Sequence, residues 1–195
     1  MEYDFKAIKK KLKSDLDEER YKHTKGVAHT AVSLAMRYEY DLQKAYLAGL
    51  LHDCAKCIPD EEKLALCKKY GHVLSESEKN NHALIHAGLG VYIAKDRYGI
   101  DDDEVLGAIR WHTTGRPGMT LLEKIIFTAD YIEPNRTKQE NLTAIRKEAF
   151  VDIDRCIYMI SSDTIRFLEK RNAGIIDPYT GQVYEFYKKK TGAEE

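Results

Sequence analysis

The spacing of hydrophobic residues predicts that the chain is helical along most of its length. Apolar residues recur every three to four positions, as in Leu42, Tyr46 and Leu50, rather than alternating as in half-buried strands. Only 4 prolines and 12 glycines interrupt these patterns in 195 residues. Helices are expected at about residues 4–18, 20–39, 41–56, 60–70, 80–98, 102–112, 119–133, 138–147 and 150–171.

These predicted helices form a single all-α domain over residues 1–195. Glycines such as Gly71 and Gly99 separate the helices, and no internal repeat, low-complexity tract or linker divides the chain. A content of 43% hydrophobic residues is enough for one core. We expect a helical core over about residues 20–171 and a short extended arm over about 174–195, where turn residues lie between apolar ones.

The charge balance excludes some classes of partner. The chain has 31 basic and 32 acidic residues, so no overall field would attract it to a nucleic-acid polymer or an anionic membrane. The N-terminal residues lack the apolar core of a signal peptide, and no apolar run approaches the roughly 18 residues of a spanning helix. We therefore expect a soluble cytoplasmic protein that holds any anionic substrate locally.

The cysteines do not suggest a separate site. Cys54 and Cys57 have the CxxC spacing of a zinc or redox site, but no second CxxC follows. In a reducing compartment, thiols are expected rather than disulfides. We assign no activity to either residue.

Two aspartates lie on the apolar faces of predicted helices. Asp53 follows Gly49 by four residues, and Asp130 follows Ile126 by four. An ionised carboxylate buried without a partner is costly, and an ordinary salt bridge or helix cap would explain one such residue. Two of them, with no surplus of inward lysine or arginine, indicate a shared cation.

Four histidines lie on or beside the same kind of face. His23 and His112 continue apolar stripes, His52 adjoins the first aspartate, and the fourth is either His82 or His86, which share a face. One inward histidine is usually a hydrogen-bonded core residue. Four of them with two aspartates offer six N and O ligands, which suit iron, manganese or zinc better than calcium. Six ligands exceed what one catalytic metal takes, so we expect two metals.

This ordered set resembles the HD superfamily, whose pattern is a first His, an adjacent His-Asp and a later Asp, all binding metal. The matching segments here are Arg20–Thr24, Leu50–Lys56 and Thr128–Asp130. Three further segments, Leu84–Gly88, Ala108–Met119 and Ala129–Arg136, resemble the YqeK branch, which consists of bacterial symmetrical diadenosine tetraphosphate hydrolases. The likeness covers the chain from about Arg20 to Arg171.

The resemblance implies an all-helical HD fold that hydrolyses a dinucleoside polyphosphate, diadenosine tetraphosphate, to two ADP. It also implies a dinuclear centre of iron, with manganese or another divalent ion as the alternative. It selects His86 rather than His82 as a ligand. The expected metal ligands are therefore His23, His52, Asp53, His86, His112 and Asp130.

Several residues near the ligands are candidates for catalysis or substrate binding. The expected nucleophile is a hydroxide that bridges the two metals, with Asp53 as a catalytic ligand. Lys56 is one helical turn away and could contact a phosphate or the leaving oxygen, although a solvated lysine is the ordinary alternative. Arg116, Arg136 and Thr113 are further candidates for binding substrate phosphates.

Two other functions are compatible with the sequence. An HD phosphohydrolase acting on nucleoside mono- or triphosphates would need only the four-residue ligand set, without His86 and His112. A metal-bound nucleotide sensor would need no turnover, and the presence of Lys56 together with all the ligands counts against it. The sequence leaves open the metal, the preferred phosphate chain length and whether the chain forms a homodimer.

Overall fold

Capping side chains set many of the helix boundaries in this computed structural model, which describes residues 3–171 and 176–193. Asp17, Asp41 and Asp152 accept hydrogen bonds from backbone N–H groups of the turn that follows. Ser75 and Thr120 form capping boxes. The helices are α1 (Phe5–Asp15), α2 (Glu18–Arg37), α3 (Leu42–Leu51), α4 (Asp60–Tyr70), α5 (Glu76–Asn80), α6 (Ile85–Tyr98), α7 (Asp103–Trp111), α8 (Leu121–Ile132), α9 (Leu142–Glu148), α10 (Ile153–Lys170) and α11 (Pro178–Thr191), with a 3₁₀ turn at His82–Leu84.

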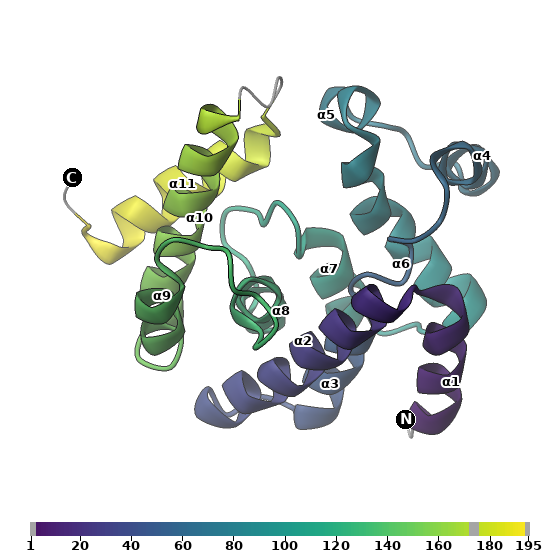
Figure 1. Ribbon diagram of the computed structural model, residues 1–195, viewed down its shortest axis with the longest axis horizontal. Helices are drawn as coiled ribbons and strands as arrows, with labels where there is room; N and C mark the ends of the chain where they lie inside the picture. Colours follow the sequence, from purple (N-terminus) through teal and green to yellow (C-terminus); the bar gives the residue numbers. More distant parts are fainter. Residues whose placement is uncertain (1–2, 172–175, 194–195) are drawn as a thin grey trace.

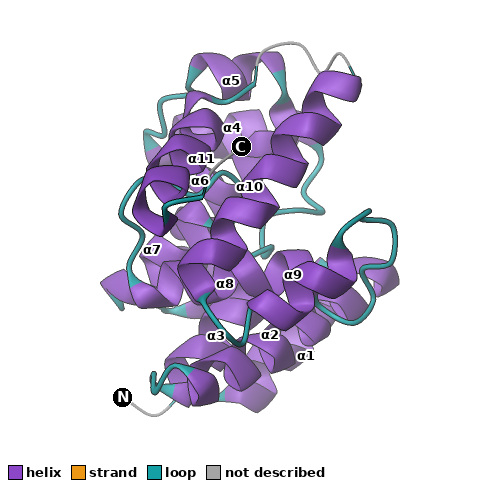
Figure 2. Ribbon diagram, turned by 90° about the vertical axis from the view of Figure 1, so that its left-hand side faces the viewer, coloured by secondary structure: helices purple, strands orange, loops and turns teal. Residues whose placement is uncertain are grey.

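The helices α2, α3, α7 and α8 form the centre of the molecule (Figure 1). The α2 helix packs along α3 and α8, and α7 packs against α3, α6 and α8. On one side of this centre α10 packs on α8, α9 and α11, and on the other side lie α1, α4 and α6. Figure 2 shows helices and loops alone, and the described residues contain no strand. The all-α prediction is confirmed.

The close approach of α2 and α3 positions two of the candidate ligands. A Cβ atom at Gly49 would lie 2.6 Å from the Cα of Ala28, so no side chain fits between the helices there. Leu34 is fully buried in the core that these helices share with their neighbours. The same approach places the rings of His23 and His52 with their centroids 5.4 Å apart.

Two predicted helix boundaries are wrong. The α3 helix ends at Leu51 rather than near residue 56, because the N–H groups of Cys54 and Lys56 bond to carbonyls three residues earlier, as in turns. The helix expected from about residue 80 begins only at Ile85, because the backbone of Asn81 is extended. The His-Asp pair therefore lies at a helix end rather than inside a helix.

The C-terminal segment is a helix, so the prediction of an extended arm is also wrong. Asp177 caps α11, and Pro178 occupies its first position, where the missing N–H costs no hydrogen bond. Val183 and Tyr187, four residues apart, are buried in α11, which packs on α10. This spacing is helical, and it outweighs the turn residues around it. Residues 174–175 and 194–195 of the predicted arm lie outside the described residues.

Candidate metal centre

The six predicted ligands converge in the interior, where α2, α3, α6, α7 and α8 meet. Five of them are buried, and the side chain of Asp130 is 21% exposed at the edge of the cluster. Two of the histidines are the C-caps of α3 and α7, and a third lies in the first turn of α6. The six residues are His23, His52, Asp53, His86, His112 and Asp130.

The carboxylate of Asp53 lies at the middle of the cluster. Its Oδ1 atom is 3.2 Å from Nε2 of His86 and 3.5 Å from Nε2 of His112. Its Oδ2 atom is 3.3 Å from Nε2 of His52 and 3.8 Å from Nε2 of His23. Asp53 therefore presents one oxygen to each half of the cluster.

All four imidazoles are fixed through Nδ1. Nδ1 of His52, His86 and His112 lies between 2.6 and 2.8 Å from a backbone carbonyl three residues earlier. Nδ1 of His23 is 3.0 Å from Oε1 of Glu133. A neutral imidazole that donates from Nδ1 keeps a lone pair on Nε2, which is the arrangement a metal requires. The four Nε2 atoms thus face the carboxylates as acceptors.

These acceptors lie too close together to be stable without a cation. Nε2 of His86 is 3.1 Å from Nε2 of His112, and burial lowers the pKa of His86 to about 4, so this ring is neutral at pH 7. The hydroxyl of Thr113, within 3.2 Å of both nitrogens, has one proton and can donate to only one of them. Within the described residues, Oδ1 of Asp53 is buried and accepts no hydrogen bond. A metal ion satisfies this set of lone pairs.

The two aspartates are ionised, as metal ligands must be. Burial opposes ionisation of Asp53, but the positive charge and N–H donation that His52 and the other imidazoles offer without a metal hold the pKa well below the usual range, and a bound cation would stabilise the same carboxylate. Burial likewise opposes ionisation of Asp130, and His23 and Arg136 hold the pKa of that carboxyl low. Two groups of three residues each hold their ligand atoms within 4.8 Å of one another: His23, His52 and Asp130, and His52, Asp53 and His112. His52 belongs to both groups.

Glu133 is a residue of the site to which the sequence analysis assigned no role. It is 1% exposed, contacts His23 through Oε1, and accepts hydrogen bonds through Oε2 from the backbone and side-chain nitrogens of Asn135, both at 2.8 Å. A carboxylate on the outer nitrogen orients a histidine for metal binding and makes it more basic. Glu133 follows Asp130 by three residues, and this spacing places both on one side of the helix end.

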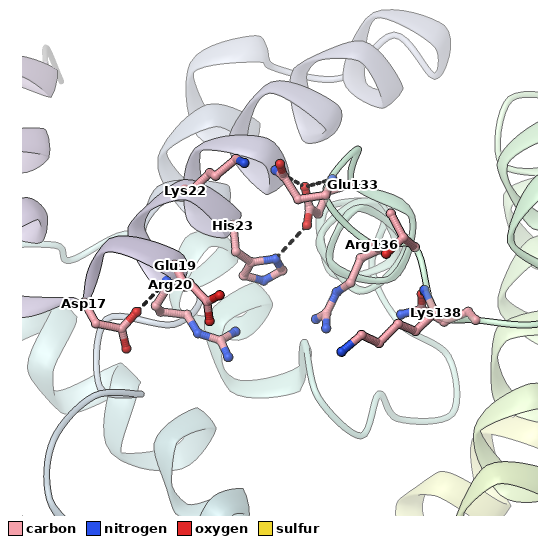
Figure 3. Close-up of a pocket in the computed structure, with 11 residues that line it drawn as sticks. Asp17, Glu19, Arg20, Lys22, His23, Glu133, Arg136 and Lys138 are labelled. Carbon is pink, nitrogen blue, oxygen red and sulfur yellow. Dashed lines mark hydrogen bonds and ion pairs between the residues drawn. The ribbon is translucent and has the colours of Figure 1, made fainter.

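Arg20 is a second residue without an assigned role in the sequence analysis. Its Nη1 atom is 2.7 Å from Oδ2 of Asp53, and its position three residues before His23 is the signal that could have identified it. Arg20 lines a cavity of about 470 Å³, which also contains Arg136 and Lys138. Figure 3 shows Arg20 and Arg136 on opposite sides of the His23 ring. Basic side chains thus line the cavity beside the cluster.

Two other predicted residues contact the cluster directly. Nζ of Lys56 is 3.4 Å from both ring nitrogens of His86, and burial lowers the pKa of Lys56. Arg136 donates to Oδ1 of Asp130 at 2.6 Å and to its backbone carbonyl at 3.0 Å. Lys56 and Arg136 therefore place positive charge at opposite ends of the cluster.

Arg116 does not reach the cluster. Its Nε and Nη2 atoms bond to the carboxylate of Glu123 at 3.0 to 3.2 Å, and the guanidinium lies over the ring of Trp111. Only the N–H groups that do not face Glu123 are left for a phosphate. The thiol of Cys57 donates to Oδ2 of Asp17.

The fold and the cluster define an all-helical protein with a buried centre of histidines and aspartates for divalent metal. A family model described as HD domain matches residues 20–135. The chain belongs to the HD domain family. Within the described residues, no helix is both long and apolar enough to cross a membrane.

The chain is similar to several known members of this family. It is 43% identical to the symmetrical bis(5'-nucleosyl)-tetraphosphatase of Bacillus subtilis, with 83% of this chain and 86% of that protein covered. It is 45% identical to the protein of the same name from Halalkalibacterium halodurans, with coverage of 84% and 87%. A crystal structure from Clostridium acetobutylicum, described as a predicted HD superfamily hydrolase involved in NAD metabolism, is 40% identical with a TM-score of 0.91 and covers 97% of this chain and 100% of its own.

Proposed function

We propose that this chain is a metal-dependent hydrolase that cleaves diadenosine tetraphosphate symmetrically into two ADP. The observation that carries the proposal is the cluster of four Nε2 lone pairs around the buried carboxylate of Asp53. The substrate comes from the two relatives named symmetrical bis(5'-nucleosyl)-tetraphosphatase. Their similarity covers more than four fifths of the chain.

Two divalent ions fit the cluster. His23, His52 and Asp130 form one group of ligands, and Asp53, His86 and His112 surround the other position, with Asp53 able to contact both. Iron is our assignment, with manganese as the alternative, because mixed nitrogen and oxygen ligands accept both ions. When bound, such a pair polarises a phosphoryl group and lowers the pKa of water.

The side chains around the ligands bind and orient the substrate. Arg136 and Thr113 border the cluster, which supports a role for both in binding phosphate oxygens. The ammonium of Lys56 lies beside His86, where it can neutralise charge that develops on the leaving phosphate. Arg116 contributes only through the N–H groups that do not face Glu123. A cytoplasmic location and a homodimer remain predictions.

Product analysis tests the reaction. Protein loaded with iron or manganese is incubated with diadenosine tetraphosphate, and the nucleotides are separated by chromatography. ADP as the only product supports symmetrical cleavage, whereas AMP together with ATP contradicts it. A release of ADP no greater than that of the His52→Ala variant would contradict hydrolysis of diadenosine tetraphosphate by this centre.

Metal analysis of a double variant separates this proposal from a phosphohydrolase of nucleoside mono- or triphosphates. Replacing both His86 and His112 by alanine removes ligands of one position and keeps the other group. We expect the metal content to fall from two ions to one per chain, with loss of activity on the tetraphosphate. One ion per chain together with full activity would contradict the dinuclear assignment.

A further inference from the structure

A second cavity adjoins the metal centre on the side opposite Arg20. It has a volume of about 600 Å³, a size typical of sites for small molecules, and lies between α8, the loop before α9 and the C-terminal half of α10. Asp130 lines this cavity, while His23, whose Nε2 is 3.0 Å from Oδ1 of Asp130, lines the first one. Arg136 and Lys138 line both. The two cavities therefore meet at the candidate ligands.

An aromatic side chain lines this cavity where the hydrophobic core ends. The α10 helix buries Ile153, Ile157 and Ile160 against the rest of the protein. Thr164 and Phe167 continue the same helical face, and both line the cavity. Phe167 is 52% exposed although it lies on the face that is buried earlier in the helix. At the C-terminal end of α10, this face of the helix therefore borders the cavity instead of the hydrophobic core.

The walls of the cavity are fixed by side-chain contacts. Oδ1 of Asp163 accepts from Asn141 at 2.8 Å and from Arg166, which ties the start of α9 to α10. Tyr131 lines the α8 side, and burial together with the nearby carboxylate of Asp163 raises the pKa of its hydroxyl. The guanidinium of Arg171 lies 4.7 Å from the ring centroid of Phe167 and covers one face of that ring. Phe167 nevertheless remains half-exposed, so part of its surface is left for a ligand.

The two cavities are lined by different kinds of side chain, so we expect them to bind different parts of a ligand. The first is lined by charged and polar side chains, without an apolar residue and with the His23 imidazole as its one aromatic ring. The second combines Tyr131 and Phe167 with basic residues, and within the described residues neither Lys138 nor Arg171 has a carboxylate within ion-pair distance. An aromatic base with an adjoining phosphate matches the second cavity and not the first.

We propose that the second cavity binds one nucleoside of the dinucleotide substrate, with its base stacked on Phe167. The adjoining phosphates then pass Arg136 and Lys138 to reach the metal centre at Asp130. This inference rests on the proposed function for the identity of the ligand. It assigns a nucleoside to this cavity and phosphate to the first one.

Calorimetric titrations of metal-loaded full-length protein with ADP and with inorganic diphosphate test this assignment. Loss of base stacking in Phe167→Ala is expected to weaken ADP binding by roughly 5- to 150-fold. The affinity for diphosphate should be unchanged, because the variant keeps every charged group. Phe167→Trp retains an aromatic face and should bind ADP like the parent protein. Phe186→Ala removes a comparably exposed ring on α11, 37% exposed and remote from the cavity, and should change neither affinity.

The outcomes separate this inference from the proposed function. ADP affinity that is unchanged in Phe167→Ala, or ADP and diphosphate affinities that fall equally, would overturn the nucleoside assignment. Failure of the parent protein to cleave diadenosine tetraphosphate would overturn the proposed function alone, since the two titrations need no turnover. A KM for diadenosine tetraphosphate that rises in Phe167→Ala with kcat retained would support both.

Discussion

Replacing Gly26 by alanine should weaken metal binding without unfolding the protein. A Cβ atom at this position of α2 would lie 2.2 Å from Oε2 of Glu133 and 3.1 Å from Nδ2 of Asn135. The carboxylate is the end of a flexible side chain and can swing away, so the backbone need not move. In doing so it loses the two hydrogen bonds from Asn135 and its contact with His23.

Opposing effects determine the size of the change. Alanine favours a helix interior over glycine by about 0.8–1.0 kcal/mol, whereas loss of hydrogen bonds to a buried charged group costs about 1.5–3 kcal/mol. We expect Gly26→Ala to be less stable by about 0.5–2 kcal/mol in denaturant unfolding. Release of His23 should lower metal affinity by about 10- to 100-fold, measured by competition with a chelator.

A glycine in open space provides the matched control. Gly181 lies in α11, and a Cβ atom added there would have no neighbouring atom within 4 Å, so Gly181→Ala should gain stability and bind metal normally. If Gly26→Ala were stabilised to the same extent and kept the parent affinity for metal, Glu133 would not be what orients His23.

Two further predictions concern charged groups. Lys56→Ala should lower kcat by about 100-fold while the metal content stays constant, whereas Lys79→Ala on the surface of α5 should change neither; loss of metal in Lys56→Ala would instead indicate a structural role. The pKa of Asp154 lies below its usual value. Burial alone would raise this pKa, but the ion pairs with Lys124 at 2.7 Å and Lys190 at 2.9 Å outweigh burial. A carboxyl with a lowered pKa stabilises the fold above its unfolded-state pKa of about 3.9, and this contribution is lost as the pH falls through the folded-state pKa. Asp154→Asn should therefore be about 1 kcal/mol less stable than the parent at pH 7, with the difference closing below about pH 4 in denaturant unfolding; a difference independent of pH would contradict the assignment.

Hydrophobic spacing predicted the all-α fold because each helix buries one face against the shared core. The same spacing did not predict helix ends at which the backbone hydrogen bonding changes while the spacing of buried residues continues. Leu51 and Cys54 are both buried, so burial alone does not reveal that a helix ends between them. In α11 the Asp177-Pro178 pair begins a helix, although the same residue types also form turns.

The sequence also predicted which ionisable residues face inward, and the structure brings all six expected ligands together. Periodicity defines a face of a helix but gives no distance between helices. It therefore could not show that Arg116 pairs with Glu123, or that Arg20 reaches Asp53. Those contacts depend on how helices pack, which local spacing does not encode.

Positions within the helices explain why His23 needs Glu133, whereas His52 and His112 need no such side chain. His52 and His112 are C-caps, so Nδ1 of each can donate to a carbonyl of the last turn, which the helix leaves without an N–H partner. His23 lies inside α2, where the carbonyl three residues earlier, that of Arg20, already accepts the backbone N–H of Thr24. Its ring must therefore be fixed by a side chain from another element. Glu133 supplies that acceptor, and Gly26 leaves the space for it.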